Sequence, residues 1–156
     1  PEVGTWEVTA ETGHVDVMLK RNHPHSVVII ENKSNRAGDQ ANQLYRYWYR
    51  NIHRHTDDLD EKYYEGNDQY RIIYLAPNET KNYSDQTCCK PLQEWFSEQE
   101  RCNYGKLPDK IPLKPLVWTF NRHLQDWLER CMEILDGSNH PIREYIRQYK
   151  EYCQTL

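Results

Sequence analysis

Residues 26–33 read SVVIIENK, and this stretch decides the fold that the sequence predicts. Its apolar, β-branched run is typical of a central strand covered on both faces. The run ends in a carboxylate, Glu31, and an ammonium, Lys33. Because side chains alternate across a strand, these two groups point to the same face. Burial of either charge alone is costly, so they form either a simple ion pair at a strand end or part of an ion-binding site.

Two further strands are expected before this one, over residues 5–10 and 14–20. Their apolar and β-branched residues alternate, and residues 11–13 supply a turn between them. Asp16 interrupts an otherwise apolar run on the second strand. If the two strands are neighbours, Asp16 brings a second carboxylate to Glu31 and Lys33.

The remaining pattern predicts helices on both sides of a sheet. A helix is expected from Asp39, as its N-cap, through Arg54, and strands over residues 70–76 and 116–120. A short helix is expected over residues 92–99. Two C-terminal helices carry apolar stripes that we expect to be core, including Leu124, Trp127, Leu128 and Ile134 in the first and Ile142, Ile146 and Cys153 in the second. We therefore predict a single α/β domain over residues 1–156, with a central mixed β-sheet flanked by helices.

Composition narrows the class of protein. No apolar run reaches the ~20 residues that span a bilayer, which leads us to expect a cytoplasmic protein. Five cysteines without a repeated C-x-x-C spacing argue against a disulfide framework and a standard zinc site. A transition-metal site at His23 and His25, at His53 and His55, or at the cysteines of residues 88–102 is an open alternative.

The charge is unevenly distributed. The whole chain carries −4, but residues 20–54 hold seven basic and two acidic residues, a local charge of +5. Such a surface can attract a polyanion, since screening limits each charge to about 10 Å. On the predicted helix, polar residues step by three and four beside the apolar stripe of Leu44, Trp48 and Ile52. The candidate contacts to nucleic acid are Arg36, Gln40, Arg46, Arg50 and Arg54, and the alternative is a charged face that only keeps the protein soluble.

The acids and the lysine suit metal-dependent hydrolysis of phosphodiesters. Mg²⁺ or Mn²⁺ prefers oxygen ligands, which Asp16, Glu31 and the backbone carbonyl of Asn32 supply. A bound ion polarises the scissile phosphate and activates water, while Lys33 orients that water or offsets charge on the phosphate.

Asp16, then Glu31-Asn32-Lys33, then Gln43-x-x-x-Tyr47 resembles the D…(D/E)-x-K…Q-x-x-x-Y pattern of PD-(D/E)XK nucleases. The resemblance is to the branch of RecB-like and phage exonuclease-like domains. Residues 29–48 (IIENKSNRAGDQANQLYRYW) are particularly similar to a bacterial group of that superfamily. The likeness continues through residues 70–77 and the two final helices, so it covers most of the chain.

The resemblance implies a restriction-endonuclease-like core that hydrolyses DNA with Mg²⁺ or Mn²⁺. Asp16 and Glu31 would bind the metal, Lys33 would be the catalytic lysine, and Gln43 and Tyr47 would position the substrate or the site. It also implies a helix before the first strand, which this chain would lack. Cleavage of RNA, endonuclease or exonuclease action, and a catalytically inactive protein that binds nucleic acid or a protein partner stay open.

Overall fold

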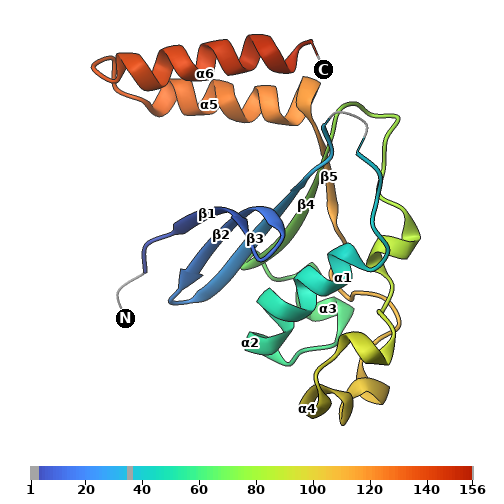
Figure 1. The fold of residues 1–156 in the computed structure, drawn as a ribbon. Helices are drawn as coiled ribbons and strands as arrows, with labels where there is room; N and C mark the ends of the chain where they lie inside the picture. The colour runs from blue at the N-terminus through green and yellow to red at the C-terminus, as the bar shows by residue number, and fades with distance from the viewer. Residues whose placement is uncertain (1–3, 35–36, 156) are drawn as a thin grey trace.

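A computed structural model describes residues 4–34 and 37–155, and in it five strands form one mixed sheet (Figure 1). The strands, in their order across the sheet, are β1 (Glu7–Thr12), β2 (Val15–Asn22), β3 (His25–Asn32), β4 (Tyr70–Ala76) and β5 (Leu116–Thr119). β1, β2 and β3 pair antiparallel as a meander, and β4 and β5 then add in parallel. β3 is therefore the middle strand, and the predicted mixed sheet is confirmed.

A helical segment covers one face of the sheet. It consists of α1 (Gln43–Trp48), the π-helical turn η2 (Tyr49–His53) and α2 (Arg54–Thr56). The prediction that Asp39 is its N-cap is wrong, because α1 starts four residues later, after Asn42 in the left-handed conformation at φ 62°. The Asp39 carboxylate instead accepts hydrogen bonds from the Tyr74 hydroxyl and the Ser84 N–H.

The main core lies between this helical segment and the sheet. Leu44, Trp48 and Ile52 are fully buried there, as the predicted apolar stripe requires, against Val27 and Ile29 of β3. The Trp48 ring meets the ring of Tyr45 edge to face at 5.2 Å, and its indole N–H donates to the Tyr64 hydroxyl at 3.2 Å.

Short helices and turns connect the parallel strands. α3 (Glu61–Glu65) lies before β4, and η3 (Asp85–Cys88), η4 (Gln93–Trp95), α4 (Glu98–Arg101) and η5 (Tyr104–Lys106) lie between β4 and β5. The single helix expected over residues 92–99 is thus divided in two. Its second part begins one residue after Ser97, because Ser97 and Glu100 form a reciprocal capping box there.

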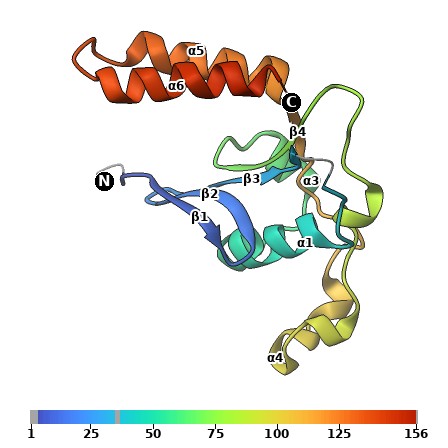
Figure 2. The same ribbon diagram turned by 45° about the horizontal axis from the view of Figure 1, so that its top comes forward.

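A helical hairpin lies on the opposite side of the sheet from α1 (Figures 1 and 2). Its elements are η6 (Phe120–Leu124), α5 (Gln125–Ile134) and α6 (His140–Cys153). A second, smaller core joins it to the sheet through Leu75, Phe120, Leu124, Leu128 and Cys153. Among the described residues, no helix is long and apolar enough to cross a membrane.

The hairpin covers only part of the sheet, which corrects two expectations. Trp127, Ile134 and Ile142 are 51%, 85% and 52% exposed, so the two apolar stripes are not core along their whole length. Val28 and Ile30 on the same side of β3 are half-buried, so β3 is fully covered only on the α1 side. Both corrections follow from the way the hairpin projects past the sheet (Figure 1).

Trp48→Ala should lower the free energy of unfolding by about 3–5 kcal/mol, because it empties a site at the centre of the main core. Urea denaturation measures the change. Trp127→Ala is the matched control, since this half-exposed ring should cost about 1 kcal/mol or less. Equal losses at the two positions would contradict the assignment of the core to the α1 side.

Candidate active site

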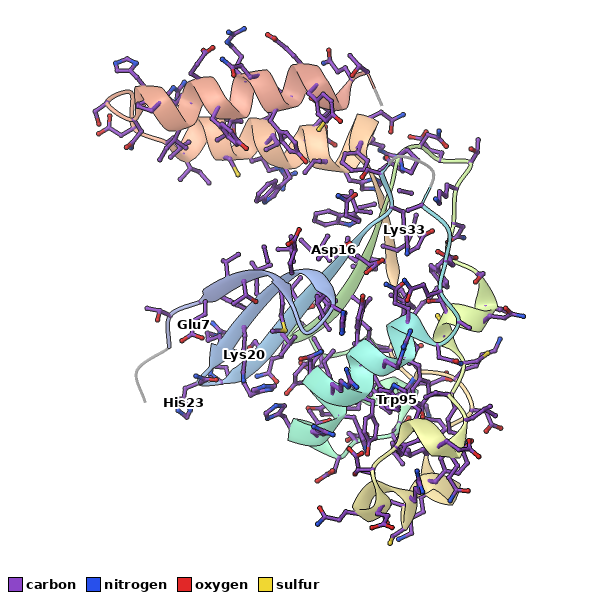
Figure 3. The ribbon with its side chains drawn as sticks, viewed as in Figure 1. Glu7, Asp16, Lys20, His23, Lys33 and Trp95 are labelled. Carbon is purple, nitrogen blue, oxygen red and sulfur yellow. The ribbon has the colours of Figure 1, made fainter. Side chains whose placement is uncertain are left out.

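The five residues predicted to be catalytic come together at one end of the sheet. Glu31 and Lys33 extend from the end of β3 on the α1 side, and Val17 pairs with Ile30, which places Asp16 beside Glu31. Gln43 and Tyr47 reach the same place from α1. All five line a pocket of about 630 Å³. Figure 3 labels Asp16 and Lys33 at this end of the sheet.

Lys33 is held by oxygen atoms on several sides. Its Nζ lies 2.7 Å from Glu31 Oε1 and donates to Gln43 Oε1 at 3.0 Å and to the Gly38 carbonyl at 3.3 Å. Asp39 Oδ1 lies 3.9 Å away. Lys33 and Glu31 are each only 3% exposed, so these partners offset the cost of burying two charges.

Gln43 and Tyr47 connect the two charges through one hydrogen-bonded chain. Gln43 accepts from Lys33 and donates through Nε2 to the Tyr47 hydroxyl at 2.8 Å. The Tyr47 hydroxyl lies 3.0 Å from Glu31 Oε2 and also contacts the His14 carbonyl oxygen. Burial and the neighbouring Glu31 raise the pKa of Tyr47, which keeps the phenol protonated and able to donate.

Glu31 occupies an environment that resists its negative charge. Burial raises the pKa of Glu31 above its ordinary value, and the charge of Asp16 adds to that rise. Hydrogen bonds from Lys33 and Tyr47 act in the opposite direction. The ionised form of Glu31 therefore depends on these two partners.

Asp16, Glu31 and Asn32 offer the hard oxygen atoms that a divalent cation prefers. The Asn32 N–H donates to Asp16 Oδ2 at 2.7 Å. Asn32 also lines the pocket with Asp16 and Glu31. No three His, Cys, Asp or Glu side chains gather as a metal site within residues 4–34 and 37–155. Two carboxylates with water and a phosphate are nevertheless the usual protein ligand set for Mg²⁺, so the donor set fits.

The predicted nucleic-acid contacts divide into three groups. Gln40, Arg46 and Arg50 line the pocket with the catalytic residues. Arg54 does not line the pocket. The π-helical turn before it changes the helical register, and Arg54 forms an ion pair with Glu100 and lies over the Tyr49 ring. Arg36 lies outside the described residues.

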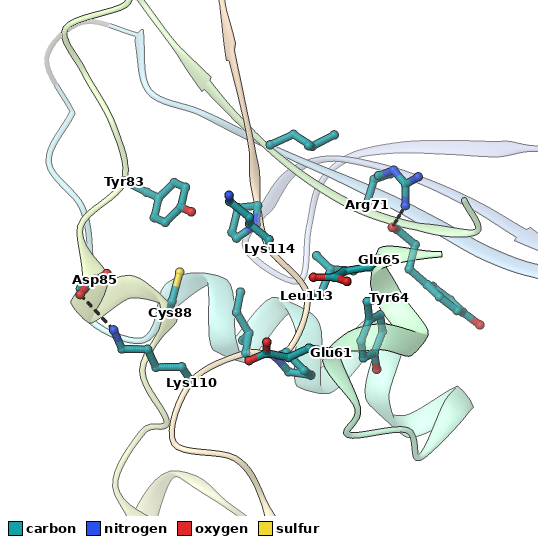
Figure 4. Close-up of a pocket in the computed structure, with 15 residues that line it drawn as sticks. Glu61, Tyr64, Glu65, Arg71, Tyr83, Asp85, Cys88, Lys110, Leu113 and Lys114 are labelled. Carbon is teal, nitrogen blue, oxygen red and sulfur yellow. Dashed lines mark hydrogen bonds and ion pairs between the residues drawn. The ribbon is translucent and has the colours of Figure 1, made fainter. Parts of the chain in front are cut away.

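Among the described residues, no group of three His, Cys, Asp or Glu side chains forms a metal site around the histidines or the cysteines. His25 stacks on His55 at 4.1 Å between ring centroids, and His53 stacks on Trp48 at 4.9 Å. A second cavity, of about 460 Å³, lies between α3 and the segments before β5, and it contains none of the predicted site residues. Figure 4 shows this cavity with the ion pair of Lys110 and Asp85 at its edge.

Sequence reasoning missed Asp39 and Gly38 as neighbours of Lys33, and Tyr74 as a residue that holds Asp39. Asp39 was expected only to cap a helix, yet it lies beside Lys33 and accepts a hydrogen bond of 2.9 Å from Tyr74. No sequence signal pointed to Tyr74, the residue of β4 that pairs with Glu31. That pairing required the register between β3 and β4, which the sequence alone does not give.

A family model described as the PD-(D/E)XK nuclease superfamily matches residues 2–151. The matched range includes every residue of the pocket described above. Nuclease-type chemistry is what this match indicates. No curated protein and no solved structure matches the chain.

Lys33→Met should cost about 3–5 kcal/mol of stability at pH 8, because it leaves the Glu31 charge buried without its main partner. The pKa of Glu31 is already raised, and loss of Lys33 raises it further. A carboxyl with a raised folded-state pKa favours folding at low pH and loses that contribution as the pH rises through the folded pKa. The deficit of Lys33→Met should therefore shrink between about pH 8 and about pH 5 in urea denaturation.

The double variant Glu31→Gln/Lys33→Met is the control for this titration. With no carboxylate at position 31, the extra pH dependence should disappear. A loss of stability in Lys33→Met that does not change with pH, or a pH dependence that persists in the double variant, would show that the ion pair is not the source of the effect.

Proposed function

The chain belongs to the PD-(D/E)XK nuclease superfamily, and from this premise we propose that it hydrolyses phosphodiester bonds of DNA with Mg²⁺ or Mn²⁺. The catalytic residues are Asp16, Glu31 and Lys33, positioned by Gln43 and Tyr47. Membership of the RecB-like and phage exonuclease-like branch remains a prediction, because the family match concerns the superfamily as a whole.

The observation that carries the proposal is the convergence of two carboxylates and one ammonium in a single pocket. Lys33 Nζ lies 2.7 Å from Glu31, and Asp16 lies beside Glu31 on the neighbouring strand. Asp16, Glu31 and the Asn32 carbonyl are the ligands that would hold the metal ion. When bound, a divalent ion polarises the scissile phosphate and lowers the pKa of a water molecule.

Lys33 acts on the reacting phosphate as a fixed positive charge. Gln43 and the Gly38 carbonyl hold its ammonium at 3.0 and 3.3 Å. An ammonium that is almost fully buried offsets negative charge on a phosphate far better than one in solvent. Tyr47 fixes the second oxygen of Glu31, so both charged groups have a defined geometry before substrate arrives.

The rim of the pocket supplies the contacts that hold the polymer. Arg46 and Arg50 lie on the outer side of α1 and η2, and Gln40 precedes them. Guanidinium groups at such a place bind the phosphates on either side of the scissile bond, without reading the bases. This local positive charge accounts for nucleic-acid binding by a chain whose net charge is −4.

Asp16→Ala and Lys33→Ala should each reduce metal-dependent cleavage by about a hundredfold or more, because each removes a group that stabilises charge at the phosphate. Rates on plasmid DNA, linear DNA and RNA, with Mg²⁺ or Mn²⁺, measure the effect and identify the polymer. Asp85→Asn is the matched control, since Asp85 pairs with Lys110 outside this pocket. Full metal-dependent cleavage by the Asp16 and Lys33 variants would contradict the proposed function.

Arg46→Ala and Arg50→Ala should each lower the dependence of DNA affinity on salt by about one unit of slope, because each contacts a phosphate. Binding of a labelled DNA at several salt concentrations measures the slope. Arg147→Ala, on the far hairpin, should leave it unchanged. Salt-sensitive binding that needs no metal and leads to no cleavage would favour the catalytically inactive alternative.

A further inference from the structure

Asp39 is a mostly buried carboxylate with three defined neighbours. Its Oδ1 accepts a hydrogen bond of 2.9 Å from the Tyr74 hydroxyl on β4, and its Oδ2 accepts one of 2.6 Å from the Ser84 N–H. Lys33 Nζ lies 3.9 Å from Oδ1, and the Asp39 side chain is 14% exposed. Two anchors from outside its own segment therefore fix this carboxylate beside the lysine.

Lys33 has two carboxylates within ion-pair distance in the described part of the chain. Glu31 is at 2.7 Å and Asp39 at 3.9 Å, while the other acceptors, on Gln43 and Gly38, are neutral. Glu31 is also a proposed metal ligand. A Glu31 oxygen that binds a cation has less negative charge to offer Lys33, so the two roles of Glu31 compete.

We propose that Asp39 is a positioning residue that shares the charge of Lys33 with Glu31, and thereby frees Glu31 to bind the metal ion. This inference rests on the proposed function. Asp39 is not among the residues that line the catalytic pocket, so it acts through Lys33 and not on the substrate. The Ser84 N–H, which binds the other oxygen of the carboxylate, is enough to keep Asp39 beside Lys33 during metal binding.

A purely structural role is the competing explanation. The hydrogen bonds of Asp39 join the segment before α1 to β4 and to the segment before η3. Loss of that junction could disturb the pocket without any effect of charge. Tyr74→Phe separates the two explanations, because it removes one anchor of Asp39 and keeps the carboxylate.

Calorimetric titration of Mn²⁺ into the metal-free protein tests the inference directly. Asp39→Asn should raise the Mn²⁺ dissociation constant by about fivefold to tenfold. Without Asp39, Lys33 pairs with Glu31 alone, and that ion pair competes with metal binding. Tyr74→Phe should change it by less than about twofold, as expected when the charge is retained. Asp85→Asn makes the same carboxyl-to-amide change one residue from Ser84 and should have no effect.

A double-mutant cycle adds a readout that a structural role would not produce. In a Lys33→Met background, Asp39→Asn should have little further effect on Mn²⁺ affinity, since the two residues act through one interaction. Wild-type affinity in Asp39→Asn, or equal losses in Asp39→Asn and Tyr74→Phe, would overturn this inference alone. Wild-type protein that binds no Mn²⁺ would overturn the proposed function together with it.

Discussion

The ion pair between Glu31 and Lys33 is the interaction on which the surrounding structure depends. Both residues are 3% exposed, and a buried pair is stable only if every remaining polar atom also finds a partner. Gln43, Tyr47 and the Gly38 carbonyl meet that requirement. The start of α1, the segment before it and the end of β3 are therefore fixed relative to one another by a few short polar contacts.

The sheet order explains why these groups meet. β3 is the middle strand, so its last residues have β2 on one side and β4 on the other. β2 contributes Asp16, and β4 contributes Tyr74, which holds Asp39. α1 packs Leu44 and Trp48 into the core and turns Gln43 and Tyr47, one helical turn apart, toward the charged pair. Apolar packing of one stripe of the helix thus positions the polar groups of the adjacent stripe.

The sequence predicted the features that depend on residues close together along the chain. Strand alternation placed Glu31 and Lys33 on one face, and the apolar run of residues 27–30 identified a central strand. The N-cap assignment of Asp39 failed because its carboxylate binds distant partners, and Arg54 lies outside the pocket, after a π-helical turn and beside Glu100. The sequence also did not predict that the C-terminal apolar stripes are exposed at Ile134 and Ile142. Amphipathic spacing predicts a helix but not how far it extends beyond its sheet.

Binding of Mn²⁺ by wild type and by Glu31→Ala, with DNA cleavage followed in the same samples, is the most direct test of the central claim. If Glu31 both holds the metal and supports catalysis, wild type binds Mn²⁺ and cleaves DNA, and the folded variant does neither. Wild type that binds no metal and cleaves nothing, or a variant that retains both properties, would contradict the account.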